Sequence, residues 1–323
     1  MENLNGKIVT AIRENIPRNQ KTVGYIADLL SVSRESAYRR IRGEKEFTLE
    51  ETHKISCDLN ISIDEMFGSI GNECVYYNLQ ANTLFDPENS FLEMLRKNNE
   101  LVKQLIRSPK TEVIAALNRL SFITHMPYKN LFKFLYYRYL YQIHDVPLNF
   151  YYSTIVIPEE IEQLRQEYTY YSPSINNITY IMDNNIFPKV IKEILYYYKR
   201  NLITRDELIV MQEDLYYLVD VIERMVKYGL NDGGSKRAVY ISTFDLDSNF
   251  RYIEYDDTVI SEFWVYPVNP LTIKDTNVCA LQKKWLGGMK KYSTLISESS
   301  ELQQSEYLNT QRNYIKNMLE GNS

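Results

Sequence analysis

The first seventy residues contain four signals for the start of an α-helix in close succession. Each is a serine or threonine directly before residues whose apolar members recur at helical spacing, and the four are Thr22, Ser33, Thr48 and Ser62. The side-chain oxygen of such a residue accepts a hydrogen bond from a backbone N–H group that the first helical turn leaves unpaired. Glu51 follows Thr48 at the spacing of a capping box, and Gly43 is placed to end the preceding helix in a left-handed conformation. With an earlier helix that stops before Pro17, the segment predicts five short helices joined by tight turns.

Beyond residue 90 the chain is poor in residues that interrupt helices. The whole sequence has only 11 glycines and 10 prolines among 323 residues, which disfavours β-sandwiches, β-barrels and glycine-rich phosphate loops. Helical periodicity predicts helices near residues 91–107, 110–125, 128–144, 158–170, 174–183, 187–200 and 205–228. After a loop at 231–234, alternating apolar residues predict strands at 238–244, 250–255 and 260–268. Helices at 277–296 and 301–319 are expected to close the chain.

These patterns predict a mainly α fold in three parts. Residues 1–70 form a five-helix domain, residues 71–90 a linker, and residues 91–323 a larger region for regulation or dimerisation. That larger region is expected to be helical over 91–230 and mixed α/β over 236–323. A length of 323 residues agrees with about two domains, because one small core rarely serves so long a chain.

Composition indicates a soluble protein of a reducing compartment. The three cysteines are far apart in the sequence and form no paired motif, so neither a disulfide framework nor a zinc site is indicated. The most apolar run, at 131–141, is interrupted by Lys133 and Arg138, and the N-terminus lacks the apolar stretch of a signal peptide. We therefore expect a cytoplasmic protein without a membrane span.

The sequence contains none of the short motifs that carry common enzyme chemistry. It has no nucleophile elbow, phosphate-binding loop, zinc-protease motif or dinucleotide-binding motif. The histidines His53, His125 and His144 are far apart, which favours surface or structural roles. We expect no enzyme activity, and hence no catalytic residue, cofactor or metal.

Tyrosine is unusually common, with 28 residues that include clusters at 136–141, 151–152, 170–171 and 196–198. At helical spacing such clusters more often pack between helices than line a ligand pocket. The same interpretation applies to Trp264 and Trp285. We predict that these aromatic residues are mainly part of the core.

Basic residues are concentrated in one short segment of an acidic chain. Residues 18–45 carry seven basic and three acidic side chains, a local charge of +4, whereas the whole chain has a formal net charge of −5. The rest of the chain therefore carries −9. A DNA duplex would attract the basic segment and repel the acidic remainder.

The basic segment has the pattern of two helices joined by a tight turn. Ala27 is small enough for close approach of the two helices, and Val32 places the turn against the core. Ala37 and Ile41 give the second of these helices an apolar inner side. Its outer side then shows Arg34, Glu35, Ser36 and Arg39, with Tyr38 and Arg42 toward the edges. A helix of this kind fits the DNA major groove, which is about 12 Å wide.

Five short segments within residues 20–68 carry a resemblance to a known family. They are Ile26-Ala27, Ser31-Val32-Ser33, residues 37–44, Thr48-Leu49-Glu50-Glu51 and Ile61-Ser62-Ile63-Asp64. Together they resemble the Cro/C1-type (XRE-like) helix-turn-helix family of bacterial and phage regulators. The resemblance implies a five-helix, lambda-repressor-like DNA-binding domain whose third helix reads bases. Two positions depart from the family pattern, since Ser31 stands where glycine is frequent and Val23 where glutamine is frequent.

The resemblance also implies which residues contact DNA. Base-reading positions fall on Arg34, Glu35, Ser36 and Arg39, and phosphate contacts at the start of the second helix fall on Lys21 and Thr22. The charges and positions of the neighbouring residues extend the predicted phosphate-contacting set to Ser33, Tyr38, Arg42 and Lys45.

The predicted function is a sequence-specific DNA-binding transcriptional regulator whose C-terminal region senses a signal, oligomerises, or both. Its expected partners are double-stranded DNA, a second copy in a homodimer, and a small-molecule or peptide effector, but no membrane. An alternative is a helical scaffold that binds a peptide or protein and is tethered to DNA by the N-terminal domain. A tyrosine-lined groove within residues 91–230 would favour that alternative. A third hypothesis, an enzyme fused to a DNA-binding head, has no supporting residue spacing.

Overall fold

The computed structural model describes residues 4–16, 21–59, 61, 63, 86–264, 270–299 and 301–320. The chain divides into two compact units, Met1–Tyr76 and Tyr77–Ser323. The fifth helix predicted between Ser62 and Phe67, and most of the predicted linker at 71–90, lie outside the described residues.

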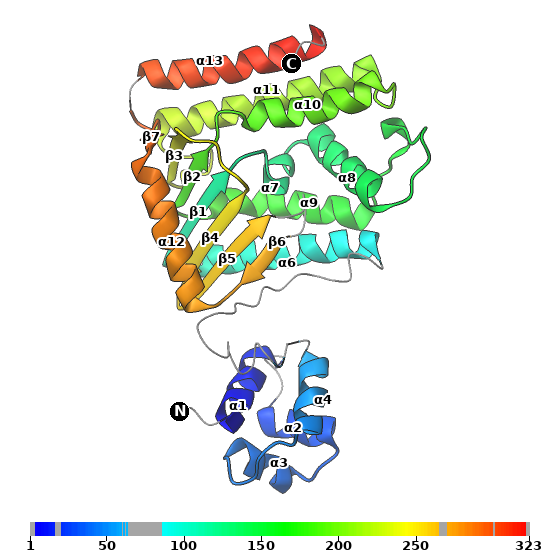
Figure 1. The fold of residues 1–323 in the computed structure, drawn as a ribbon, viewed down its shortest axis with the longest axis vertical. Coiled ribbons are helices and arrows are strands. Elements are labelled where there is room, and N and C mark those ends of the chain that lie inside the picture. Colours follow the sequence, from blue (N-terminus) through cyan, green and yellow to red (C-terminus); the bar gives the residue numbers. More distant parts are fainter. Residues whose placement is uncertain are drawn as a thin grey trace. The chain divides into compact units, whose positions relative to one another are not determined.

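Four helices make up the described part of the smaller unit (Figure 1). They are α1 (Leu4–Asn15), α2 (Thr22–Leu30), α3 (Arg34–Ile41) and α4 (Leu49–Leu59). Each helix turns an apolar side inward, and the resulting core consists of Ile8, Ile12, Ile26, Ala27, Leu30, Ala37 and Ile55. Val32 and Ile41 are partly buried and pack against this core, as the sequence predicts.

Most of the predicted helix signals in this unit are confirmed. Ser33 caps α3, since its hydroxyl accepts a hydrogen bond from the Ser36 N–H group at 3.2 Å. Thr48 and Glu51 form the capping box, in which each side chain accepts a hydrogen bond from the other residue's N–H group, at 3.2 and 3.1 Å. Gly43 follows the C-cap of α3 with a φ of 77°, which glycine adopts without strain.

The prediction that Thr22 caps the second helix is wrong. The helix α2 already begins at Thr22, and Lys21 occupies the N-cap position without a side-chain hydrogen bond. Lysine carries only donors, so it cannot accept a hydrogen bond from the free N–H groups of the first turn.

A seven-stranded mixed sheet forms the centre of the larger unit, with the strand order β6-β5-β4-β1-β2-β3-β7. Its middle strands β1 (Thr111–Leu117), β2 (Ile178–Met182) and β3 (Arg237–Ser242) run parallel, with Val113 opposite Ile178 and Thr179 opposite Ala238. The outer strands are antiparallel to their neighbours. They are β4 (Phe250–Tyr255), β5 (Thr258–Trp264), β6 (Pro270–Ile273) and β7 (Ser293–Leu295).

Helices cover the two faces of this sheet unequally (Figure 1). The large core on one face holds residues from α6 (Pro87–Arg107), α7 (Phe122–His125), α8 (Lys129–Ile143), α9 (Glu159–Tyr171), α10 (Ile186–Lys199), α11 (Arg205–Tyr228) and α13 (Glu301–Asn317). The described part of this unit also has short 3-10 helices at Tyr152–Thr154, Ser172–Ser174 and Met318–Glu320. The smaller core on the other face is covered by α12 (Thr276–Lys291), which contributes Cys279 and Leu286.

The expectation of a mainly α fold is wrong, because the larger unit is α/β. The segments predicted as helices at 110–125 and 174–183 contain the central strands β1 and β2. Strand β1 is buried on both faces: Val113 and Ala115 belong to the large core, and Ile114 and Ala116 to the smaller one. A strand buried on both faces is a continuous apolar run without alternation, so its periodicity resembles that of a buried helix.

The sheet also contains two strands that the sequence analysis did not predict. Strand β6 has only four residues, and β7 has three and lies inside the segment predicted as a helix at 277–296. The remaining helices and the strands β3, β4 and β5 lie close to their predicted positions. The sheet thus joins strands from the region expected to be helical with strands from the region expected to be mixed.

The tyrosine clusters are largely part of the core, as predicted. Tyr137 is fully buried, with its ring 5.1 Å from that of Tyr197 and stacked on Phe150 at 5.5 Å. The exceptions, with exposed side chains, are Tyr151, Tyr170, Tyr171 and Tyr196. Within the described ranges, no helix combines the length and apolar character needed to cross a membrane.

Candidate nucleic-acid interface

The turn between α2 and α3 is only three residues long, and each residue has a separate role. Ser31 ends α2 in the left-handed conformation, with φ 54° and ψ 44°. The Val32 N–H group then donates to the Ala27 carbonyl at 3.0 Å, and the Val32 side chain packs on the core. Ser33 caps the start of α3. The two helices are therefore held in a fixed relation by backbone and side-chain bonds together.

Arg40 anchors the inner side of α3. Its side chain is 3% exposed, and its Nε and Nη2 atoms donate to the two carboxylate oxygens of Glu51 at 3.0 and 2.6 Å. Its Nη1 atom donates to the hydroxyl and carbonyl oxygens of Ser36 at 2.6 and 3.2 Å. The hydrogen bond from Arg40 is the main cause that lowers the pKa of Glu51 below its ordinary value. A bidentate pair of this geometry fixes α3 against the first turn of α4.

Asn5 fixes the C-terminal end of α3 to α1. Its amide nitrogen donates to the Arg40 carbonyl at 2.8 Å, and its amide oxygen accepts from the Phe47 N–H group at 3.1 Å. The side chain is 5% exposed, so these bonds are shielded from water. Together with the Arg40–Glu51 pair, they attach the C-terminal end of α3 to α1 and α4.

Three of the four residues predicted to read bases lie on the exposed side of α3. Arg34, Glu35 and Arg39 are exposed, and Arg34 has no hydrogen bond or ion pair with any described residue. Ser36 differs from the prediction, because it is only partly exposed and its hydroxyl is bonded to Arg40. The structure thus brings two arginines and one glutamate together on the outer surface.

Most of the residues predicted to contact phosphates are also exposed. Lys21, Ser33, Tyr38, Arg42 and Lys45 are exposed, and Thr22 is partly buried in the first turn of α2. The Arg42 guanidinium lies 5.6 Å from the centre of the Tyr38 ring, a cation–π distance.

Glu44 lies near two of the basic side chains. It is 3.8 Å from Arg39 and 3.6 Å from Arg42, and all three side chains are about half exposed. Such surface pairs contribute about 0–1 kcal/mol, so Glu44 holds the two arginines only weakly. The arginines are therefore available to a phosphate.

The anchoring role of Arg40 was not predicted, because the residue was counted only among the basic side chains of the segment. The signal was present, because Arg40 lies three residues after Ala37 and so on the inner side of the helix. Its partner Glu51 was assigned only to the capping box. The glutamate serves both roles, since its Oε2 atom accepts from both the Thr48 N–H group and Arg40.

The histidines are separated in the structure and do not form a site. His53 is exposed near the Cys57 sulfur, and His144 is exposed at the end of α8. His125 is 2% exposed with its Nδ1 atom 2.7 Å from the Ser121 carbonyl oxygen, and burial lowers its pKa to about 4. Among the described residues, no group of three or more His, Cys, Asp and Glu side chains is arranged to hold a metal ion.

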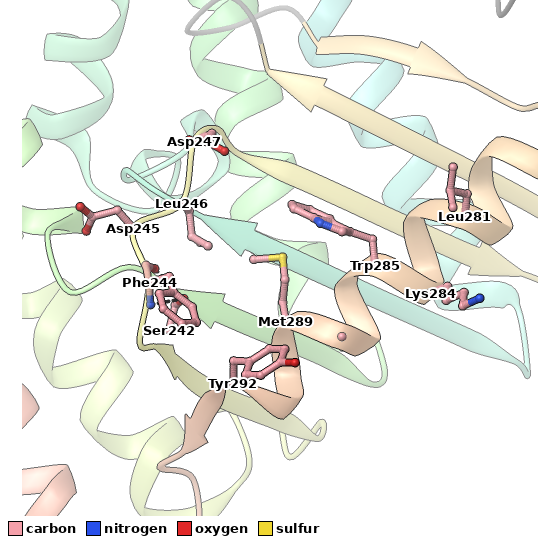
Figure 2. A pocket seen from close by; sticks show the side chains of 11 residues that line it. Ser242, Phe244, Asp245, Leu246, Asp247, Leu281, Lys284, Trp285, Met289 and Tyr292 are labelled. Carbon is pink, nitrogen blue, oxygen red and sulfur yellow. Dashed lines mark hydrogen bonds between the residues drawn. The ribbon is translucent and has the colours of Figure 1, made fainter. Parts of the chain in front are cut away.

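The larger unit has an open groove of about 500 Å³ between α12 and the loop that follows β3 (Figure 2). Its lining includes Phe244, Leu246, Leu281, Trp285, Met289 and Tyr292, with Asp245, Asp247 and Lys284 at its sides. Trp285 is 46% exposed there, so the prediction that it belongs to the core is wrong, whereas Trp264 packs against the large core. The residues of this groove come from 242–292 and not from the tyrosine-rich helices.

Comparison with known proteins gives one family match. The family described as BetR domain matches residues 7–92, which is less than half of the chain. No curated protein and no solved structure matches the chain.

Proposed function

We propose that the protein is a sequence-specific DNA-binding transcriptional regulator. In this proposal the smaller unit is a helix-turn-helix domain of the Cro/C1 type, and α3 enters the major groove. The larger unit oligomerises, senses an effector, or both. The work of such a regulator takes place on bacterial DNA, so the proposal includes a cytoplasmic location.

The single observation that carries the proposal is the contrast between the two sides of α3. The inner side is fixed by the buried Arg40 and Ala37, while the outer side presents Arg34 and Arg39 without a buried partner. A rigid helix that is anchored through one basic residue and exposes two others has the form that major-groove recognition needs. An arginine that reaches a guanine bidentately supplies about 1–3 kcal/mol of discrimination against a wrong base.

Lys21, Arg42 and Lys45 have a different role in this proposal. They are exposed and carry long, flexible cationic side chains. Contacts from such residues to phosphates raise affinity for any sequence and make it dependent on salt, with each neutralised phosphate adding about 0.9 to the logarithmic salt slope. Arg34 and Arg39 should instead decide which sequence is preferred.

The test is enrichment of bound fragments from a genomic pool at one fixed salt concentration. We expect the wild-type chain to enrich a small set of related sequences, and the double variant Arg34→Ala/Arg39→Ala to lose that preference. The matched control is Arg13→Ala/Lys54→Ala, which removes two exposed positive charges from α1 and α4 of the same unit. Equal enrichment of the same sequences by wild type and the α3 variant would show that the proposal is wrong.

A second measurement separates base reading from phosphate binding. For a site that the wild type enriches, we expect Lys21→Ala and Lys45→Ala each to reduce the salt slope and to weaken binding to all sequences alike. Arg34→Ala should reduce the ratio between preferred and random sequence. If the lysine and arginine variants change affinity and preference in the same proportion, α3 does not read bases.

A further inference from the structure

The helix α12 covers its face of the sheet without a neighbour among the described helices (Figure 1). The core beneath it is small and contains Ile114, Ala116, Ile181, Leu246, Tyr252, Ile273, Cys279 and Leu286. Tyr240, Phe250 and Phe263 pack against this core but remain partly exposed. One helix is therefore too narrow to cover the apolar surface that this face presents.

The outer side of α12 is itself apolar. Leu281, Trp285, Gly288 and the C-cap residue Tyr292 are spaced by four, three and four residues, which places them along one side of the helix. Leu281, Trp285 and Tyr292 are 67%, 46% and 65% exposed. Phe244, from the loop across the groove, is 65% exposed and lies edge-on to Tyr292 at 6.2 Å. Large apolar side chains exposed side by side in this way are typical of a surface that another protein covers.

Two glycines lie in this helix where the chain itself has no need for them. A Cβ atom added at Gly287 or Gly288 would meet nothing within 4 Å. Glycine in a helix interior destabilises the helix relative to alanine, so its presence requires a reason. At Gly288, in the middle of the apolar side, the absence of a side chain allows another backbone to approach closely.

The two walls of the groove carry opposite charges. Lys284 lies on α12, and Asp245 and Asp247 lie on the loop opposite (Figure 2). None of these three side chains forms an ion pair with a described residue. When two identical surfaces meet around a two-fold axis that runs along the groove, each wall faces the opposite wall of the other copy. Lys284 of one copy then approaches Asp245 and Asp247 of the other.

We propose that α12 and the loop at 243–247 form the interface through which two copies of this chain associate. The self-complementary charges favour a second copy over an unrelated partner. The exposed stripe runs from Leu281 to Tyr292 and forms one wall of the groove, opposite the acidic loop. The biological role of this interface rests on the proposed function. Two helix-turn-helix domains can bind the two half-sites of one DNA duplex together when their chains form a dimer.

The experiment is sedimentation of the full chain without DNA over a range of concentrations. We expect wild type to form a dimer, and Leu281→Glu to raise the dimer dissociation constant at least about tenfold, as loss of a buried interface anchor does. The matched control is Leu302→Glu on α13, where a leucine of 68% exposure, against 67% for Leu281, lies outside the groove. The control should dimerise like wild type.

Two further variants keep the test independent of folding. Gly288→Gln improves the helix of the single chain but places a side chain in the interface, so the monomer should become more stable to heat while the dimer weakens. Lys284→Glu should weaken the dimer through repulsion from Asp245 and Asp247, and the triple variant Lys284→Glu/Asp245→Lys/Asp247→Lys should restore it.

The outcomes divide clearly. A wild-type chain that stays monomeric at all concentrations, or a dimer that is unaffected by both Leu281→Glu and Gly288→Gln, would overturn the interface. Binding of DNA is measured separately by the fragment enrichment described above. If the chain dimerises through α12 but shows no sequence preference on DNA, the proposed function is wrong and the interface is supported. If the chain shows sequence preference but its dimer does not depend on α12, the interface is wrong and the proposed function is supported.

Discussion

Substitution of Arg40 by alanine should release α3 from the rest of the smaller unit. The variant removes a guanidinium whose side chain is 3% exposed and which donates two hydrogen bonds to Glu51 and two to Ser36. Breaking a fully buried ion pair costs about 3–5 kcal/mol. The side chain of Glu51 is 18% exposed, so its carboxylate regains some water when Arg40 is lost. We therefore expect a loss of about 2–4 kcal/mol, which includes the packing of the arginine stem.

Hydrogen exchange of backbone amides, read by mass spectrometry, measures this loss in each segment. A change of 1.36 kcal/mol corresponds to a factor of ten, so exchange in α3 and α4 should accelerate about 30- to 1000-fold, up to the limit set by complete unfolding of the unit. Peptides from β1 and α11 in the larger unit should be unchanged. This local readout is needed because both tryptophans, Trp264 and Trp285, lie in the larger unit and do not report on the smaller one.

Arg39→Ala is the matched control for this prediction. It removes the arginine directly before Arg40 in the same helix. The side chain of Arg39 is 56% exposed and lies 3.8 Å from Glu44. Substitutions at such surface positions usually change stability by less than about 0.5 kcal/mol. If Arg40→Ala and Arg39→Ala gave the same exchange in α3, the buried pair would not anchor the helix and the reasoning would be refuted.

The folded-state pKa of Glu51 lies below 4.5, so its stabilising effect is complete above that pH and is lost as the pH falls through the lower folded value. Acid should therefore lower the protection factors of α3 and α4, which are exchange rates corrected for the rate of an unstructured chain at the same pH. Glu51→Gln, already destabilised at neutral pH, should lose that part of the acid sensitivity. Ser31→Gly should stabilise the smaller unit by about 0.5–1 kcal/mol by removing a left-handed serine, and unchanged or faster exchange in α2 would contradict this. Gly229→Ala should destabilise the larger unit by about 1–3 kcal/mol in thermal unfolding followed by tryptophan fluorescence, because φ is 64° and the new Cβ would lie 2.6 Å from the Glu298 carboxylate. Gly287→Ala, where a Cβ meets nothing, is its control and should not destabilise.

Much of the smaller unit could be predicted because its signals are local. The hydroxyl of Ser33 accepts a hydrogen bond from Ser36, three residues further along the chain. The capping box joins Thr48 to Glu51 over the same sequence distance. Interactions over one helical turn depend little on the rest of the fold. The exposed position of Arg39 followed in the same way, because it lies two residues after Ala37 and so on the opposite side of the helix.

The candidate site was predicted less completely where a partner is distant in sequence. Ser36 was assigned to the outer surface, but its hydroxyl is bonded to Arg40, whose orientation depends on Glu51 eleven residues further on. The groove beside α12 was not predicted at all. It brings Phe244 together with Trp285 and Tyr292, which lie about forty residues further along the chain.

The sequence by itself determined where most helices begin and end, because capping bonds and apolar periodicity act within one or two turns. Only the tertiary structure decided that residues 111–117 and 178–182 are strands, since their apolar residues satisfy either a buried helix or a buried strand until neighbouring strands pair with them. Tertiary contacts likewise decided that Arg40 is an anchor and that Trp285 is exposed. In each case the deciding interaction lies between segments that are far apart in the chain, and no local pattern encodes it.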